Sequence, residues 1–150
     1  MTEAAAQPRA RASLAERAGA ALLALCCLAP LVVAAGLTPD PAGAGTHTQL
    51  GIQACGWAVS FGVPCPTCGM TTAFAHVAHL NLLDGLKAQP LGFLLAVGSA
   101  AGFWVALHVA ATGSLIGRTC GRMLSPRNLW VLAAVAAGSW AYKWLTWPAP

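Results

Sequence analysis

Residues 90–112 read PLGFLLAVGSAAGFWVALHVAAT, and this stretch decides the fold class of the chain. It contains no Asp, Glu, Lys or Arg and exceeds the roughly 20 residues that cross a bilayer as a helix. Two further apolar blocks, residues 19–37 and 129–147, approach the same length. Only Lys143 interrupts them, close enough to an end for its side chain to reach the headgroups. We therefore predict an all-α, polytopic membrane protein with three transmembrane helices.

The composition supports the same class. Hydrophobic residues make up 57% of the 150 residues and charged residues only 8%, whereas about a quarter of a soluble domain is charged. Such a chain has too few charges to cover a surface that faces water. The net charge of +4 is explained by membrane topology and contact with anionic lipid, so we expect the lipid bilayer as a partner and no nucleic acid.

The arginines predict the orientation. They cluster before the first block and between the second and third blocks, and cytoplasmic segments carry such an excess; they are Arg9, Arg11, Arg17, Arg118, Arg122 and Arg127. The N-terminus is then cytoplasmic and the C-terminus extracytoplasmic. The predicted order is a partly disordered cytoplasmic tail, a span, an extracytoplasmic segment, a span, a cytoplasmic loop and a span, at residues 1–18, 19–37, 38–89, 90–112, 113–128 and 129–147.

The first block has a second interpretation as a signal peptide, because arginines precede it and Ala42-Gly43-Ala44 resembles a cleavage site. Its apolar run, however, exceeds the roughly 7–15 residues of a signal-peptide core. We therefore predict a retained helix that bends near Pro30.

The extracytoplasmic segment carries a cysteine motif. Residues 62–72 read GVPCPTCGMTT, which places the thiols of Cys65 and Cys68 three residues apart. We predict a helix from residue 69 to about residue 80, with Thr72, His76 and His79 on one polar face. A further short helix ends before Pro90. Both are too short to span a bilayer, so we expect them at the membrane surface or re-entrant.

This motif, together with Ala73-Phe74 and residues 84–91 (DGLKAQPL), resembles the domain-of-unknown-function 2752 family of small bacterial membrane proteins over about residues 50–105. The resemblance implies a multi-pass protein of the bacterial cell membrane with no established activity. Cys55 fits the upstream cysteine of the family, and the structural motif positions are Pro64, Pro66, Gly69 and Thr71. Two positions depart from the family pattern: Thr72 replaces arginine and Gln89 replaces asparagine. If that arginine binds an anionic group, this chain lacks the contact.

Three functions are compatible with the motif. The first is structural or partner-binding: a disulfide or prolyl turn fixes the motif helix for docking to other membrane helices or a second copy. The second is thiol–disulfide redox chemistry at Cys65 and Cys68. The third is a zinc site in which Cys55, Cys65 and Cys68 are joined by His76 or His79. The sequence contains no hydrolase triad, phosphate loop or paired carboxylates, so we do not expect the chain to be an enzyme by itself.

Overall fold

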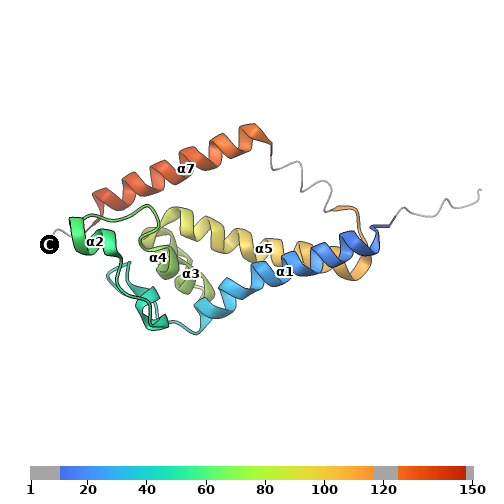
Figure 1. The fold of residues 1–150 in the computed structure, drawn as a ribbon, viewed down its shortest axis with the longest axis horizontal. Coiled ribbons are helices and arrows are strands. Elements are labelled where there is room, and N and C mark those ends of the chain that lie inside the picture. The colour runs from blue at the N-terminus through green and yellow to red at the C-terminus, as the bar shows by residue number, and fades with distance from the viewer. Residues whose placement is uncertain (1–10, 117–124, 148–150) are drawn as a thin grey trace, which may run out of the picture.

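The computed structural model describes residues 11–116 and 125–147, and in this part of the chain every regular element is a helix (Figure 1). The all-α prediction is therefore confirmed. Arg9, Arg118 and Arg122, most of the predicted N-terminal tail and the middle of the predicted cytoplasmic loop lie outside the described residues. The elements are α1 (Leu14–Ala35), η1 (Thr46–Leu50), α2 (Gly56–Phe61), α3 (Met70–Ala78), α4 (Leu82–Ala88), α5 (Pro90–Thr112) and α7 (Pro126–Leu145).

The long helices α1 and α5 lie side by side and run antiparallel (Figure 1). Ser13 and Glu16 form a capping box at the start of α1, which places that start five residues before the predicted span. Pro30 lies inside α1. The second helix, α5, covers the same residues as the second predicted span and ends at Gly113, which adopts φ 70°. Both helices are long and apolar enough to cross a membrane.

The third predicted span, residues 129–147, agrees less well with the structure. A helix does form there, but α7 begins at Pro126 and is not among the helices long and apolar enough to cross a membrane. The physical reason is its polar content, because Arg127 and Asn128 lie in its first turn and Lys143 lies near its end. The part of the chain that the structure describes therefore gives two candidate spans, where the sequence predicted three.

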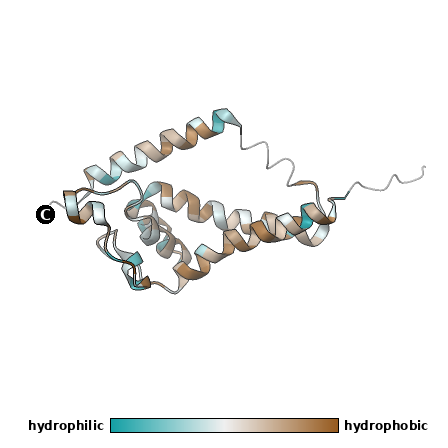
Figure 2. Ribbon diagram, in the orientation of Figure 1, coloured by the Kyte–Doolittle hydropathy of each residue, from teal (hydrophilic) through white to brown (hydrophobic). Residues whose placement is uncertain are grey.

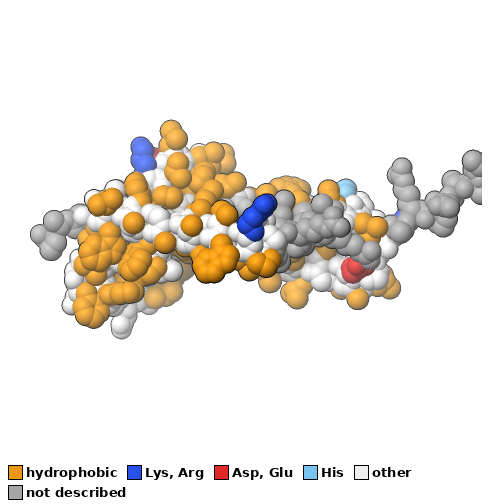
Figure 3. Space-filling model, turned by 90° about the horizontal axis from the view of Figure 1, so that it is seen from above, with side chains coloured by type: hydrophobic (Ala, Val, Ile, Leu, Met, Phe, Trp, Pro, Cys, Tyr) orange, Lys and Arg blue, Asp and Glu red, His pale blue; other side chains and the backbone are white. Residues whose placement is uncertain are grey.

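Hydrophobic residues make up most of the long helices (Figure 2). Large hydrophobic side chains there are at least half exposed, for example Leu22, Leu25, Leu94, Trp104 and Trp130. From above, hydrophobic side chains cover much of the molecule and charged ones are few (Figure 3). Apolar exposure on this scale is unfavourable in water and is removed when the helices face lipid.

The short helices gather at one end of the α1–α5 pair (Figure 1). Helix α3 packs against both long helices and against α4, and the side chains of Ala73 and Ala75 are fully buried. Gly92 permits this approach, because a Cβ there would stand only 3.0 Å from the Cβ of Ala73. The predicted motif helix thus exists as α3, and it is wedged between long helices with its first residue directly after the cysteine motif.

Candidate functional site

The cysteine motif folds as two overlapping turns that lead into α3. The N–H of Cys68 donates to the carbonyl of Cys65 at 3.1 Å, and that of Met70 donates to the carbonyl of Thr67 at 3.1 Å. Both proline carbonyls of the motif accept hydrogen bonds from distant side chains. Trp140 Nε1 donates to Pro64 at 3.1 Å, and Gln89 Nε2 donates to Pro66 at 3.3 Å. The loop is therefore fixed from two sides.

Gly69 is required by the geometry of this loop. Its φ is 88°, in the left-handed region that disfavours residues with a Cβ. A Cβ would also stand 2.7 Å from the carbonyl oxygen of Gly43, 2.9 Å from that of Ala88 and 3.2 Å from Lys143 Nζ. The close approach of three segments at this point positions Cys68 immediately beside it.

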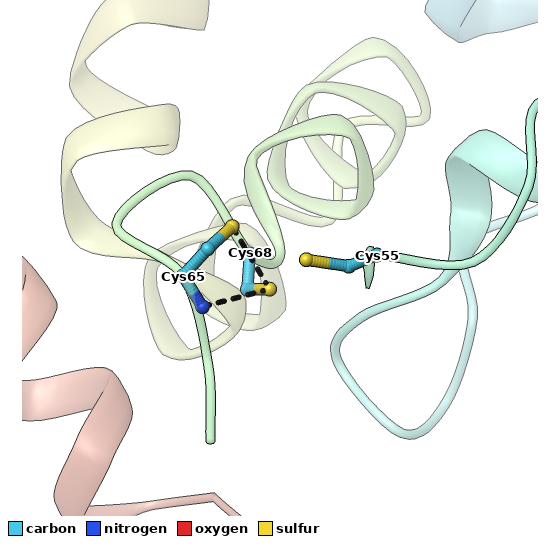
Figure 4. Close-up of side chains that lie close together, drawn as sticks. All are labelled: Cys55, Cys65 and Cys68. Atoms are coloured by element: carbon cyan, nitrogen blue, oxygen red, sulfur yellow. Dashed lines mark hydrogen bonds between the residues drawn. The ribbon is translucent and has the colours of Figure 1, made fainter. Parts of the chain in front are cut away.

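Three thiols meet at the start of α3 (Figure 4). The Sγ atoms of Cys65 and Cys68 are 3.2 Å apart, and the backbone N–H of Cys65 also donates to Cys68 Sγ at 3.2 Å. Cys55 lies just before α2 and points toward this pair from the other side. All three Sγ atoms lie within 4.8 Å of one another, and all three cysteines are free.

The two motif thiols differ in acidity. Partial burial raises the pKa of Cys65, but hydrogen bonds from the Thr67 side chain, Cys68, the Thr67 backbone and Cys55 outweigh it and lower this pKa to about 7. Cys68 is buried, and that burial, together with its hydrogen bond and proximity to Cys65, raises its pKa to about 12. The pair therefore combines an acidic, part-exposed thiol with a buried one that keeps its proton.

A cavity of about 630 Å³ adjoins the thiols. The three cysteines contribute to its wall, as do Thr67, Thr71 and the first turn of α3. Among the described residues, no Asp, Glu, Lys or Arg lines it. Its volume lies within the range of small-molecule sites.

The buried ammonium of Lys143 lies behind the motif. It is 4% exposed, and Nζ donates to the carbonyls of Gly43 at 2.9 Å and Ala88 at 3.0 Å. The prediction that this side chain reaches the headgroups is therefore wrong. Two backbone carbonyls replace the water that a lysine would otherwise seek. The sequence analysis did not predict that Lys143 is buried and bound to two carbonyls. The signal that could have indicated it is the single charge within an apolar block.

The histidines do not join the thiols. His79 Nε2 lies 3.0 Å from the carbonyl oxygen of Leu37 at the end of α1, and His76 Nδ1 is buried without a hydrogen-bond partner. The group of metal-compatible side chains contains the three cysteines and neither histidine. Thr72, which replaces the arginine of the family pattern, is buried and pairs with Thr46 through their Oγ1 atoms at 2.8 Å.

Comparison with known proteins identifies one segment. Residues 55–103 match the family model described as "Protein of unknown function (DUF2752)", which confirms the resemblance seen in the sequence. No curated protein and no solved structure matches the chain. The matched segment begins at the first of the three thiols and ends inside α5, so it contains the whole cluster.

Proposed function

We propose that Cys65 and Cys68 form the dithiol of a membrane thiol–disulfide redox protein. Both lie in residues 55–103, the segment that matches the DUF2752 family model. The observation that carries this proposal is the contact between the two Sγ atoms at 3.2 Å, with Cys65 part-exposed at the cavity and Cys68 buried. Disulfide exchange needs an accessible attacking thiolate and a second thiol within reach of it. This pair meets both requirements.

The exchange proceeds in two steps. The Cys65 thiolate attacks one sulfur of a substrate disulfide, forming a mixed disulfide and releasing the other sulfur as a thiolate. Cys68 then loses its proton and attacks Cys65 Sγ, which releases the second substrate sulfur and leaves a Cys65–Cys68 disulfide. The substrate gains two electrons and, on its released thiolate, the proton of Cys68, while the pair loses two electrons. The same steps in reverse oxidise a substrate dithiol at the expense of the Cys65–Cys68 disulfide. A pKa of about 7 makes Cys65 the attacking residue at neutral pH.

The proposed setting is the bacterial cell membrane, with α7 as a third span beside α1 and α5. Backbone and side-chain hydrogen bonds support one orientation: Ala12 N donates to Gly113 O at 2.8 Å, and Arg17 Nε donates to Ala110 O at 2.9 Å. Arg17 therefore lies at the end of the α1–α5 pair opposite the short helices α2, α3 and α4, which adjoin the cysteine motif (Figure 1). The positive-inside rule then assigns this end to the cytoplasm and the thiols to the other side. The apolar outer faces suit lipid, other membrane helices or a second copy.

A zinc site is the second candidate, and the approach of a third sulfur favours it. Cys55, Cys65 and Cys68 bring three Sγ atoms within 4.8 Å, and thiolates are preferred zinc ligands. Zinc would take three protein ligands there and leave a fourth position for a ligand from the cavity. The proposal differs from the sequence prediction because neither His76 nor His79 supplies that ligand.

A structural or partner-binding motif is the third interpretation. The hydrogen bonds that Trp140 and Gln89 donate to the motif prolines support it, since they fix the loop without any reaction. A permanent Cys65–Cys68 disulfide would serve the same purpose.

Thiol tagging in glutathione redox buffers, with zinc analysis of the same purified protein, separates the three candidates. We expect Cys65 and Cys68 to oxidise and reduce together as one two-electron couple. Replacement of either by Ser abolishes the couple, whereas Cys26→Ser, on the exposed face of α1, leaves it unchanged.

Cys55→Ser separates the first two candidates. Redox chemistry at the pair survives this change, whereas stoichiometric zinc would be lost with it. Zinc that shields all three thiols from tagging contradicts the redox proposal. A pair that stays oxidised in every buffer contradicts both redox and zinc chemistry and favours the structural role.

A further inference from the structure

A second, smaller cavity lies beside the thiol cavity, on the side of α1. It has a volume of about 270 Å³ and lies between the end of α1 and the first turns of α3. Met70 and Thr71 belong to the walls of both cavities, so the two spaces are neighbours across these residues. One wall of the smaller cavity is Val33, which is 49% exposed on the outer face of α1. The two cavities therefore lie side by side between the thiols and a helix face suited to lipid.

The walls of the two cavities differ in chemistry. The larger one offers hydrogen-bonding groups, including Thr67, Thr71 and His47, together with the indole of Trp147, and among the described residues no Asp, Glu, Lys or Arg. The smaller one, apart from Thr71, is lined by hydrocarbon and aromatic side chains; they are Pro30, Val33, Ala34, Leu37, Met70 and Phe74. A ligand that fills both has an uncharged head with hydrogen-bond acceptors and a hydrocarbon tail.

We propose that this double cavity binds a prenylated quinone, with the ring beside Cys65 and the tail along the groove between α1 and α3. The inference rests on the proposed redox function, because it names the electron acceptor of the dithiol. A quinone ring is uncharged, carries two carbonyl acceptors and is dissolved in the bilayer through its tail. Three thiols, a cavity without Asp, Glu, Lys or Arg in its described wall and an apolar groove come together at this place.

The reaction balances without a further reactant. The two Sγ–H bonds of Cys65 and Cys68 break and one Sγ–Sγ bond forms, which releases two electrons and two protons. The quinone takes up both, and its two carbonyl oxygens become the hydroxyls of the hydroquinone. The resulting disulfide is available for exchange with a protein or small-molecule dithiol, which regenerates the reduced pair.

The test uses the full-length protein, reduced and freed of reductant in detergent. Decylubiquinone and duroquinone are the probes: both rings are fully substituted, which prevents addition of thiols to the ring, and only the first has a tail. Quinone reduction is followed by ultraviolet absorbance and disulfide formation by thiol tagging. We expect decylubiquinone to oxidise the pair at a half-saturating concentration at least about tenfold below that of duroquinone, because its tail is buried.

Val33→Trp fills the groove from the outer face of α1, and Val32→Trp is its matched control. Val32 is 60% exposed on the same helix and lines neither cavity. The indole of Val33→Trp should displace about two methylene groups of the tail from the groove. Because these groups are then no longer buried, the half-saturating concentration of decylubiquinone should rise roughly tenfold. The control and the duroquinone reaction should change by less than about twofold.

The outcomes separate this inference from the redox proposal. Oxidation by glutathione disulfide but not by decylubiquinone overturns the quinone site and leaves the dithiol function standing. Oxidation by neither overturns both. Equal effects of the two tryptophan variants overturn the tail groove.

Photolabelling of the unmodified protein with a quinone that carries an azide on its tail needs no variant. It should label residues 30–37 and 70–74, and labelling confined to other segments also refutes the site.

Discussion

Gly69→Ala is the most revealing single change, because a methyl group at this point enters the contact between three segments. The substituted residue must keep φ near 88° to preserve the start of α3. Its Cβ must also avoid two carbonyl oxygens at 2.7 and 2.9 Å, which are the acceptors of the Lys143 ammonium. The loop therefore shifts or Lys143 loses a hydrogen bond.

The magnitude follows from two contributions. The left-handed conformation costs a residue with a Cβ about 1–2 kcal/mol. Loss of one hydrogen bond to a buried charged donor costs roughly 1.5–3 kcal/mol. We therefore expect Gly69→Ala to lower the free energy of unfolding by about 2.5–5 kcal/mol. Gly62→Ala is the matched control, since Gly62 has φ 67° and nothing within 4 Å of its Cβ position. This control retains only the conformational cost.

Unfolding of the two variants by sodium dodecyl sulfate in mixed micelles, followed by tryptophan fluorescence, measures the difference. Trp140 reports on the motif directly, because its indole donates to the carbonyl of Pro64. If the two variants lose the same stability to within about 0.5 kcal/mol, the crowding at Gly69 is not as the structure has it, since that figure is far below one charged hydrogen bond.

Four further predictions concern the same region. Alkylation of Cys65 by iodoacetamide, followed by mass spectrometry, should accelerate as the pH rises through about 7, because the thiolate reacts and the pKa of Cys65 is about 7. Thr67→Val should move this midpoint to higher pH, since it removes a hydrogen bond that lowers the pKa, whereas Thr71→Val should not; an unchanged midpoint in Thr67→Val contradicts the assignment. Lys143→Met should cost at least about 2 kcal/mol in the micelle assay through two lost hydrogen bonds, and Lys87→Met, at an exposed side chain, should have little effect. Thr72→Val should cost about 0.5–1.5 kcal/mol because it removes the hydrogen bond between the two hydroxyls, and Thr46→Val should cost more because Thr46 Oγ1 also accepts from the N–H of Asp40 at 3.0 Å; equal losses in the two variants would contradict this assignment.

The sequence predicted the parts of the fold that depend on interactions between residues close together in the chain. An apolar run without charges gave α5 its bounds, and the turn residues before Met70 located the start of α3. The approach of Cys65 to Cys68 followed from their spacing. Cys55 was included through the family resemblance, because its position depends on how the chain returns after η1.

Spacing along the chain does not predict features that depend on packing between distant segments. Helical spacing put His76 and His79 on a polar face, but spacing does not reveal which neighbour covers that face. For His79 the neighbour is the end of α1, 42 residues away in the chain. Lys143 met backbone carbonyls instead of headgroups for the same reason, since its partners Gly43 and Ala88 are separated from it by 100 and 55 residues.

The attachment of α7 to the motif has a consequence for which positions tolerate substitution. Trp140, Tyr142 and Lys143 all donate to main-chain carbonyls, and these belong to Pro64, Lys87, Gly43 and Ala88. Every residue has a main-chain carbonyl, so the accepting residues can be substituted as long as the backbone conformation is preserved. The donors on α7 have no such freedom. A saturation-mutagenesis scan should therefore be asymmetric, with Lys143 intolerant and its accepting partner Ala88 open to other small residues.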